Sequence, residues 1–194
     1  MRLILVRHGE THENKKEIWQ GHHQGMLNEE GREQARKLIK RLEKEKIDII
    51  YCSDLERTRD TIQPFLEKYG VPVYYVEALR ERNLGLLEGM KNEDVKKYLK
   101  KHNLDLTSDL ESGESYDDVR KRLSDFYYKT LDKHEGETVL FVTHGGSIAQ
   151  LITCLLGYPK AEFRNYVPKN TGVSEIRAKK GKPELILFDD ISHL

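Results

Sequence analysis

Two apolar runs, each ending close to a histidine, are the main features of the hydrophobic pattern. The run 3–6 continues directly into Arg7 and His8, and the run 139–142 continues through one threonine into His144. The strands that contain them are predicted over 2–6 and 137–142. Each run has the length and the branched-residue content of a buried strand, with glycine just beyond it. The pattern therefore predicts two strands that each deliver a histidine to their carboxyl end.

The rest of the chain alternates between strand-like and helix-like segments. Further strands are predicted at 47–52 and 71–76, and a hairpin is predicted where 173–176 and 185–188 flank a lysine-rich turn at 179–182. Apolar residues at helical spacing predict five helices: after Asn28, from a Ser53–Glu56 capping box to Gly70, at 92–101, after Ser115, and at 147–156. This alternation predicts one α/β domain over 1–194, a three-layer sandwich with a mostly parallel sheet, one antiparallel strand and helices on both faces.

The charge balance and the lack of long apolar stretches argue against some classes of binding partner. The 33 basic and 33 acidic side chains give a formal net charge of zero, which argues against nucleic acid or an acidic membrane surface. No apolar stretch approaches the ~20 residues that cross a bilayer, and the N-terminus lacks the pattern of a signal peptide. We expect a cytoplasmic protein in which Cys52 and Cys154 are small core residues without a disulfide.

The histidines and arginines that follow the predicted strands are expected at the carboxyl edge of the sheet, where open α/β proteins bind ligands. Arg7 stands beside His8, and a guanidinium suits bidentate contact with phosphate. Arg57 falls in the first turn of a predicted helix, whose free N–H groups favour an anion. His144 is followed by Gly145 and opens another such helix. Two histidines, two arginines and two helix N-termini at one edge predict phosphate chemistry.

A carboxyl group lies between two arginines at Arg80-Glu81-Arg82. A surface ion-pair network is one interpretation. The other is a proton donor, because phosphoryl transfer must protonate the leaving oxygen.

A metal site is not expected. His8 and His12 stand four apart, but glycine follows the first histidine where a zinc-protease helix has glutamate. The doublet His22-His23 lies in a polar loop and is interpreted as part of the rim of the site. No cofactor is expected.

These motifs, in this order, resemble the histidine phosphatase superfamily, the phosphoglycerate-mutase-like proteins, over nearly the whole chain. The matching blocks are Arg7–Thr11 with Asn14, Trp19–Gly21, Leu27–Ala35, Ser53–Thr58, Leu79–Glu81 with Gly85 to Gly89, Gly113–Ser115 and Thr143–Gly146. The resemblance implies that His8 is a nucleophile that becomes phosphohistidine and that Glu81 donates the proton. It further implies a phosphate pocket of Arg7, Arg57 and His144, with Asn14, Gln20, Gly21 and Gly145 as further binding residues.

The family includes hydrolases and mutases. Mutases are longer and usually carry histidine and tyrosine after the acid, whereas Glu81 here is followed by Arg82-Asn83-Leu84. Both departures favour a phosphatase acting on a small phosphorylated metabolite. A bisphosphoglycerate-dependent phosphoglycerate mutase and a non-catalytic phosphate-binding homologue are the alternatives.

The loops expected to set specificity are 19–26 and 83–115. They carry six candidate contact residues: Trp19, Met26, Leu84, Leu86, Tyr98 and Tyr116. A sugar phosphate, a phosphorylated acid, a cobalamin-precursor phosphate and a broad set of esters all stay open, as do a monomer and a homodimer.

Overall fold

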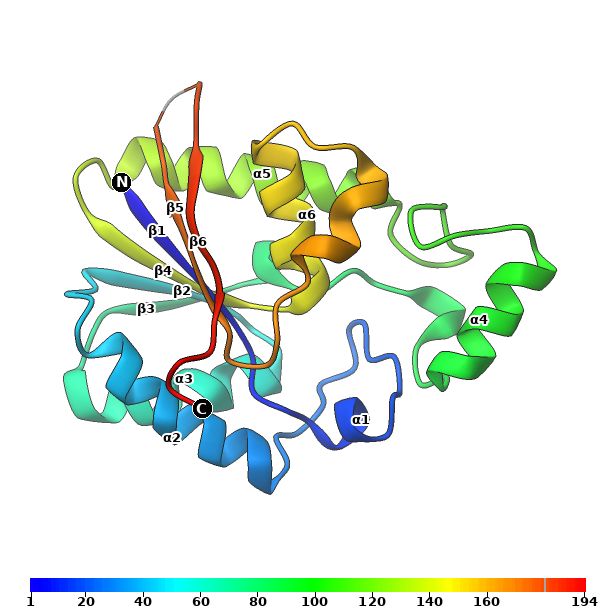
Figure 1. The fold of residues 1–194 in the computed structure, drawn as a ribbon, viewed down its shortest axis with the longest axis horizontal. Coiled ribbons are helices and arrows are strands. Elements are labelled where there is room, and N and C mark those ends of the chain that lie inside the picture. Colours follow the sequence, from blue (N-terminus) through cyan, green and yellow to red (C-terminus); the bar gives the residue numbers. More distant parts are fainter. Residues whose placement is uncertain (180) are drawn as a thin grey trace.

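In the computed structural model, which describes residues 1–179 and 181–194, six strands form one mixed sheet (Figure 1). The strands are β1 (Arg2–Arg7), β2 (Ile49–Ser53), β3 (Val73–Val76), β4 (Thr138–Thr143), β5 (Val173–Arg177) and β6 (Glu184–Asp190). Their order across the sheet is β3-β2-β4-β1-β5-β6. β5 pairs antiparallel with both β1 and β6, and the other neighbours pair parallel, so the predicted single antiparallel strand is confirmed.

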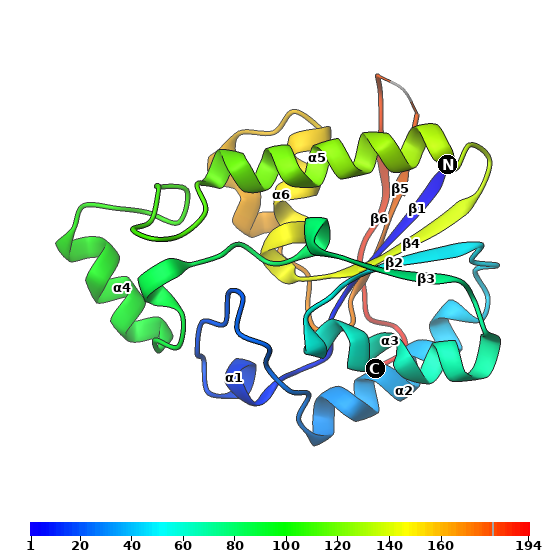
Figure 2. The same ribbon diagram turned by 180° about the vertical axis from the view of Figure 1, so that it is seen from behind.

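Helices cover both faces of this sheet. The α-helices are α1 (His12–Lys15), α2 (Glu29–Leu42), α3 (Glu56–Tyr69), α4 (Asn92–Lys101), α5 (Tyr116–Lys133) and α6 (Gly145–Leu155). The 3-10 helices are η1 (Glu77–Leu79), η2 (Gly85–Leu87) and η3 (Lys160–Tyr166). Helices α2 and α3 lie on one face and α5 and α6 on the other (Figures 1 and 2), which confirms the predicted sandwich.

Strand alternation divides the core into two clusters. Leu3 and Leu5 of β1 face a cluster that includes residues of α5 and α6, whereas Ile4 and Val6 face a cluster that includes residues of α2 and α3. A strand covered on both faces reads as a continuous apolar run. This double burial is why β1 and β4 were recognisable in the sequence.

Two of the predicted helix starts are capped as expected. The Asn28 side chain accepts a hydrogen bond from the Gly31 N–H, at 2.8 Å, and the Ser115 side chain accepts one from the Asp118 N–H, at 3.0 Å. The short helix predicted at 92–101 is α4.

The predicted capping box at Ser53 was wrong. Ser53 is the last residue of β2, Leu55 occupies the N-cap, and α3 begins at Glu56. The Ser53 hydroxyl instead lies 2.9 Å from Nε2 of His144. The local pattern resembles a cap, but the hydroxyl is paired with His144, which follows the neighbouring strand β4.

Other boundaries differ by a few residues. Helix α6 begins at Gly145 rather than at 147, because His144 already serves as its N-cap with an extended backbone. The strands predicted to begin at 47 and 71 begin at 49 and 73. Helix η3 was not predicted, and residue 180 of the predicted hairpin turn lies outside the described residues.

Helix α4 and its flanking loops extend beyond the end of the sheet (Figures 1 and 2). This segment has its own small apolar cluster, built around Leu87, Val95, Leu99 and Leu110, with Trp19 packed against it. None of the helices in the described part of the chain has the length and apolarity to cross a membrane. Cys52 is buried in the sheet, and burial raises the pKa of its thiol to about 12.

Candidate active site

The two histidines meet because β1 and β4 are neighbours. The register pairs Arg7 with Thr143, so His8 and His144 follow at the same level of the carboxyl edge. Their ring centroids are 5.3 Å apart. A cavity of about 340 Å³ opens beside them, with both predicted arginines, Arg7 and Arg57, in its wall.

The hydrogen bonding of His8 fixes its tautomer. Nδ1 lies 2.8 Å from the carbonyl oxygen of Gly9, and a carbonyl can only accept, so Nδ1 carries the hydrogen. Nε2 of the neutral ring then holds a lone pair. Burial lowers the pKa of His8 well below its usual value, and the positive charges of Arg57 and Arg7 lower it further. The ring is therefore neutral at neutral pH, the state in which a histidine can act as a nucleophile.

Arg57 is buried and holds the loop in front of the site. Its Nη2 donates to the carbonyl of Gly21 at 2.8 Å, and its Nη1 donates to those of His23 and Gln24. Its Nε donates to Nδ1 of His144 at 3.2 Å. Burial lowers the pKa of Arg57 to about 10, which leaves it cationic at neutral pH.

His144 lies beneath the cavity and does not line it. Nδ1 accepts from Arg57, so Nε2 carries the hydrogen and donates to the Ser53 hydroxyl. Burial and the charge of Arg57 lower the pKa of His144 well below its usual value. In this structure His144 orients Arg57, and its expected contact with phosphate stays a prediction.

Arg7 presents an unsatisfied donor. Its Nη1 donates to the carbonyl of Pro168 at 2.7 Å, while its buried Nε has no hydrogen-bond partner within the described residues. Gly145 lies so close that an added Cβ would stand 3.2 Å from this Nε. A cation with a buried, free N–H fits an anionic ligand.

Glu81 reaches the N-terminus of α6. One carboxyl oxygen accepts from the N–H of Gly146 at 2.9 Å, and the other accepts from the N–H of Arg82 at 2.9 Å. The Ser147 hydroxyl lies 3.4 Å from that second oxygen. These donors fix the carboxyl group in the wall of the cavity that also holds His8.

The arginines on either side of Glu81 have different partners. Arg80 makes the ion pair that the alternative interpretation expected, with its Nε 2.7 Å from a carboxyl oxygen of Asp54. Arg82 makes no such pair with any described residue, and all three of its side-chain nitrogens donate to main-chain carbonyls. The ion-pair interpretation therefore applies to Arg80 and leaves Glu81 free to face the cavity.

The remaining predicted residues also lie in the cavity wall. Asn14, Gln20, Gly21 and Gly145 all line it. Gly21 has a φ of +50°, and a Cβ there would stand 2.1 Å from a carboxyl oxygen of Glu88, so no other residue fits without rearrangement.

Of the six residues expected to set specificity, Trp19 and Leu84 line the cavity. Met26 and Leu86 are more than half exposed, Tyr116 is buried without lining it, and Tyr98 packs against the apolar cluster around α4 without lining it. The sequence analysis missed several other lining residues, among them Leu106, Gln150 and Phe163.

Arg122 was also missed. It donates to the carboxyl group of Glu114 and to the carbonyls of Ala78 and Arg80, and so holds the segment before Glu81. A signal was present in the sequence. Arg122 stands three residues after Val119, on the inward stripe of α5, where an apolar residue is expected.

The described part of the chain holds no cluster of side chains suited to a metal ion. Of the histidine doublet, His22 contacts the main-chain carbonyl of Glu81 through Nε2, at 2.8 Å, and His23 is mostly exposed. Both histidines belong to the loop that Arg57 holds, which agrees with their interpretation as part of the rim.

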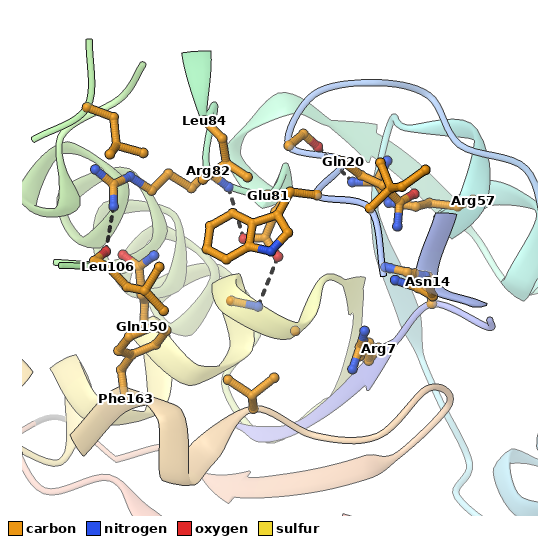
Figure 3. Close-up of a pocket in the computed structure, with 18 residues that line it drawn as sticks. Arg7, Asn14, Gln20, Arg57, Glu81, Arg82, Leu84, Leu106, Gln150 and Phe163 are labelled. Carbon is orange, nitrogen blue, oxygen red and sulfur yellow. Dashed lines mark hydrogen bonds between the residues drawn. The ribbon is translucent and has the colours of Figure 1, made fainter. Parts of the chain in front are cut away.

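Figure 3 shows how the lining residues divide the cavity. Arg7, Asn14 and Arg57 lie on one side of the view, and Leu106, Gln150 and Phe163 lie on the other. Glu81 lies between the two groups. A phosphoryl group on the cationic side would thus direct its ester oxygen toward the carboxyl group.

Comparison with known proteins gives a consistent result. The family model described as histidine phosphatase superfamily (branch 1) matches residues 3–191. A probable phosphatase of Schizosaccharomyces pombe is 36% identical, over 100% of this chain and 95% of that protein. A broad-specificity phosphatase of Saccharomyces cerevisiae is 34% identical, over 96% of this chain and 84% of that protein. The solved structure of a mycobacterial glucosyl-3-phosphoglycerate phosphatase, complexed with VO3, superposes on this chain with a TM-score of 0.88 at 28% identity. The match covers 97% of this chain and 98% of that chain.

Proposed function

The chain belongs to the histidine phosphatase superfamily and is a phosphomonoester hydrolase, and we propose that it acts on small esters, without metal, through a phosphohistidine at His8. The observation that carries this proposal is the state of His8. Its ring is neutral, with the Nδ1 hydrogen held by the carbonyl of Gly9 and the Nε2 lone pair available beside two arginines.

In the first half-reaction, Nε2 of His8 forms a bond to phosphorus as the ester P–O bond breaks. The electron pair of that bond goes to the leaving oxygen, which takes a proton from Glu81 and departs as the alcohol. Arg7 and Arg57 stabilise the charge on the phosphoryl oxygens. Their burial makes this stabilisation larger than it would be in water.

In the second half-reaction, water attacks phosphorus and the P–N bond breaks. The electron pair returns to Nε2, and the carboxylate of Glu81 accepts the proton that water loses. Inorganic phosphate then leaves, and Glu81 and His8 are restored to their starting states. The same carboxyl group thus serves as acid and then as base, which the fixed position of Glu81 between the two sides of the cavity supports.

Phosphate release from a panel of esters in the presence of EDTA tests the proposal. The panel contains 3-phosphoglycerate, phosphoserine, fructose 2,6-bisphosphate, ribazole phosphate and an aryl phosphate. We expect release by the wild type and loss of release in His8→Ala. Interconversion of 2- and 3-phosphoglycerate without release of phosphate would instead identify a mutase.

A further inference from the structure

The side of the cavity away from the phosphate pocket has a largely apolar wall. It is formed by five side chains from four separate segments: Trp19, Leu84, Leu106, Leu110 and Phe163. Because Glu81 lies between this wall and the arginines, the leaving group of a bound ester must extend along it (Figure 3). A leaving group with an apolar body would bury surface there.

The guanidinium groups that line the cavity either belong to the proposed phosphate pocket or bind main-chain carbonyls. Among the described lining residues, the arginines are Arg7, Arg57 and Arg82. The first two lie in the phosphate pocket. Arg82 donates from Nε to the carbonyl of Glu114, from Nη1 to that of Leu106 and from Nη2 to that of Ser108, at 2.7–2.9 Å. Arg82 therefore anchors the loop over the cavity, and a carboxylate on the leaving group would find no uncommitted guanidinium in the wall.

One neutral polar group interrupts the apolar wall. Gln150 is 3% exposed, and its amide oxygen has no hydrogen-bond partner within the described residues. It stands four residues after Gly146, the residue that holds Glu81, and so lies on the same face of α6. Neighbouring positions on one face are about 5–6 Å apart.

A hydroxyl group is the best match for this amide. The amide oxygen accepts and the amide nitrogen donates, and half a turn about χ3 exchanges them. A hydroxyl can both donate and accept, so it pairs with Gln150 in either orientation. A carboxylate can only accept, and it would bring a charge into an apolar wall at a large desolvation cost.

We infer that this side of the cavity, as the leaving-group subsite of the phosphatase proposed above, selects esters of uncharged alcohols. The preferred leaving group is apolar beside the ester oxygen and carries a further hydroxyl, about one helical turn away, for Gln150. Esters whose leaving group carries a carboxylate are discriminated against.

Three matched esters test the inference: benzyl phosphate, 4-(hydroxymethyl)benzyl phosphate and 4-carboxybenzyl phosphate. They share the same type of leaving oxygen and differ in the group that reaches Gln150. We expect kcat/KM for the hydroxymethyl ester to exceed that for benzyl phosphate about fivefold, the effect of one net hydrogen bond. It should exceed that for the carboxy ester about 100-fold or more, because the charge is buried without a partner.

Variants at position 150 distinguish the contribution of the Gln150 amide from that of the apolar side chains around it. Gln150→Met keeps the length of the side chain and should abolish the advantage of the hydroxymethyl ester over benzyl phosphate. Gln150→Lys should shift the preference toward the carboxy ester. Gln63→Met, at an exposed position of α3, is the matched control and should leave all three rates unchanged. Thermal unfolding of each variant confirms that it is folded.

The outcomes distinguish the inference from the function on which it rests. If the carboxy ester is hydrolysed as fast as the hydroxymethyl ester, and all activity is lost in His8→Ala, the subsite is wrong and the phosphatase stands. Unchanged ratios in folded Gln150→Met would likewise refute the role of Gln150. If His8→Ala retains full activity, both proposals fail, whereas hydrolysis of esters of the earlier panel but of none of these three refutes the subsite alone.

Discussion

A methyl group at position 146 would strike the carboxyl group of Glu81. A Cβ added to Gly146 would stand 2.6 Å from one carboxyl oxygen, where ordinary contact begins at 3.4 Å. The carboxyl group must therefore retreat by most of an ångström or lose its hydrogen bond to the N–H of residue 146. Either change moves the proposed proton donor away from the leaving oxygen. Gly146→Ala thus perturbs Glu81 without altering its chemistry.

The size of the effect depends on the leaving group. A displacement approaching 1 Å costs about 100-fold in rate, so we expect kcat/KM for benzyl phosphate to fall by about that factor. The 4-nitrophenolate anion leaves readily without a proton, so hydrolysis of 4-nitrophenyl phosphate should fall less than about fivefold. Glu81→Gln should show the same selectivity. The assay is the ratio of the two kcat/KM values for each variant.

The adjacent glycine supplies the control. A Cβ at Gly145 would stand 3.2 Å from Nε of Arg7 and 3.1 Å from Val167, so Gly145→Ala disturbs the phosphate pocket instead. It should slow both esters by the same factor. Alanine favours a helix over glycine by about 1 kcal/mol, so neither variant should lose thermal stability through the helix. Equal slowing of both esters by Gly146→Ala would refute Glu81 as the proton donor.

Three further predictions concern charge and burial. Burial and two arginines hold the pKa of His8 well below 6.5. After correction for ionisation of the ester, kcat/KM should therefore stay level as the pH falls from neutral through 6.5 and should decline only at lower pH. A decline in kcat/KM with its midpoint at or above pH 6.5 would contradict this. Below pH 6.5 the unfolded chain binds a proton at His144, whereas the folded chain, in which His144 is buried, does not. As the pH is lowered below 6.5, the free energy of unfolding should therefore decrease by up to about 1.4 kcal/mol per pH unit from this residue. Urea unfolding of His144→Asn should show a weaker fall, and an unchanged slope would refute the assignment. Arg82→Met leaves three carbonyls without their donor and should raise KM more than it lowers kcat, with faster proteolysis in 106–114; a normal KM would show that Arg82 does not hold this loop.

Much of the fold could be predicted because its central strands are buried on both faces. The runs at β1 and β4 are continuous and apolar, and the helices beside them carry clear inward stripes. The positions of Arg7, His8 and Glu81 in one cavity followed from the strand ends and from the family motifs. Local patterns failed where a distant partner decided the outcome, as for Ser53, whose hydroxyl binds His144 from a neighbouring strand instead of capping a helix.

The far side of the cavity could not be predicted in the same way. Leu106 comes from an irregular segment and Phe163 from the 3-10 helix η3, which the sequence pattern did not predict, and each meets the cavity through long-range packing. Gln150 lies on a helix that is apolar on nearly every side, where a single amide carries no pattern of its own. Its environment depends on how the loop held by Arg82 closes over the helix.

The covalent intermediate gives the most direct test of the proposed mechanism. The enzyme is mixed with excess 4-nitrophenyl phosphate in EDTA, quenched with base within the first turnovers, digested, and analysed by mass spectrometry. The mechanism predicts one base-stable, acid-labile phosphoryl group on His8 of the wild type, with no adduct and no turnover in His8→Ala. Turnover that persists in His8→Ala, or a phosphoryl group on another residue, would contradict it.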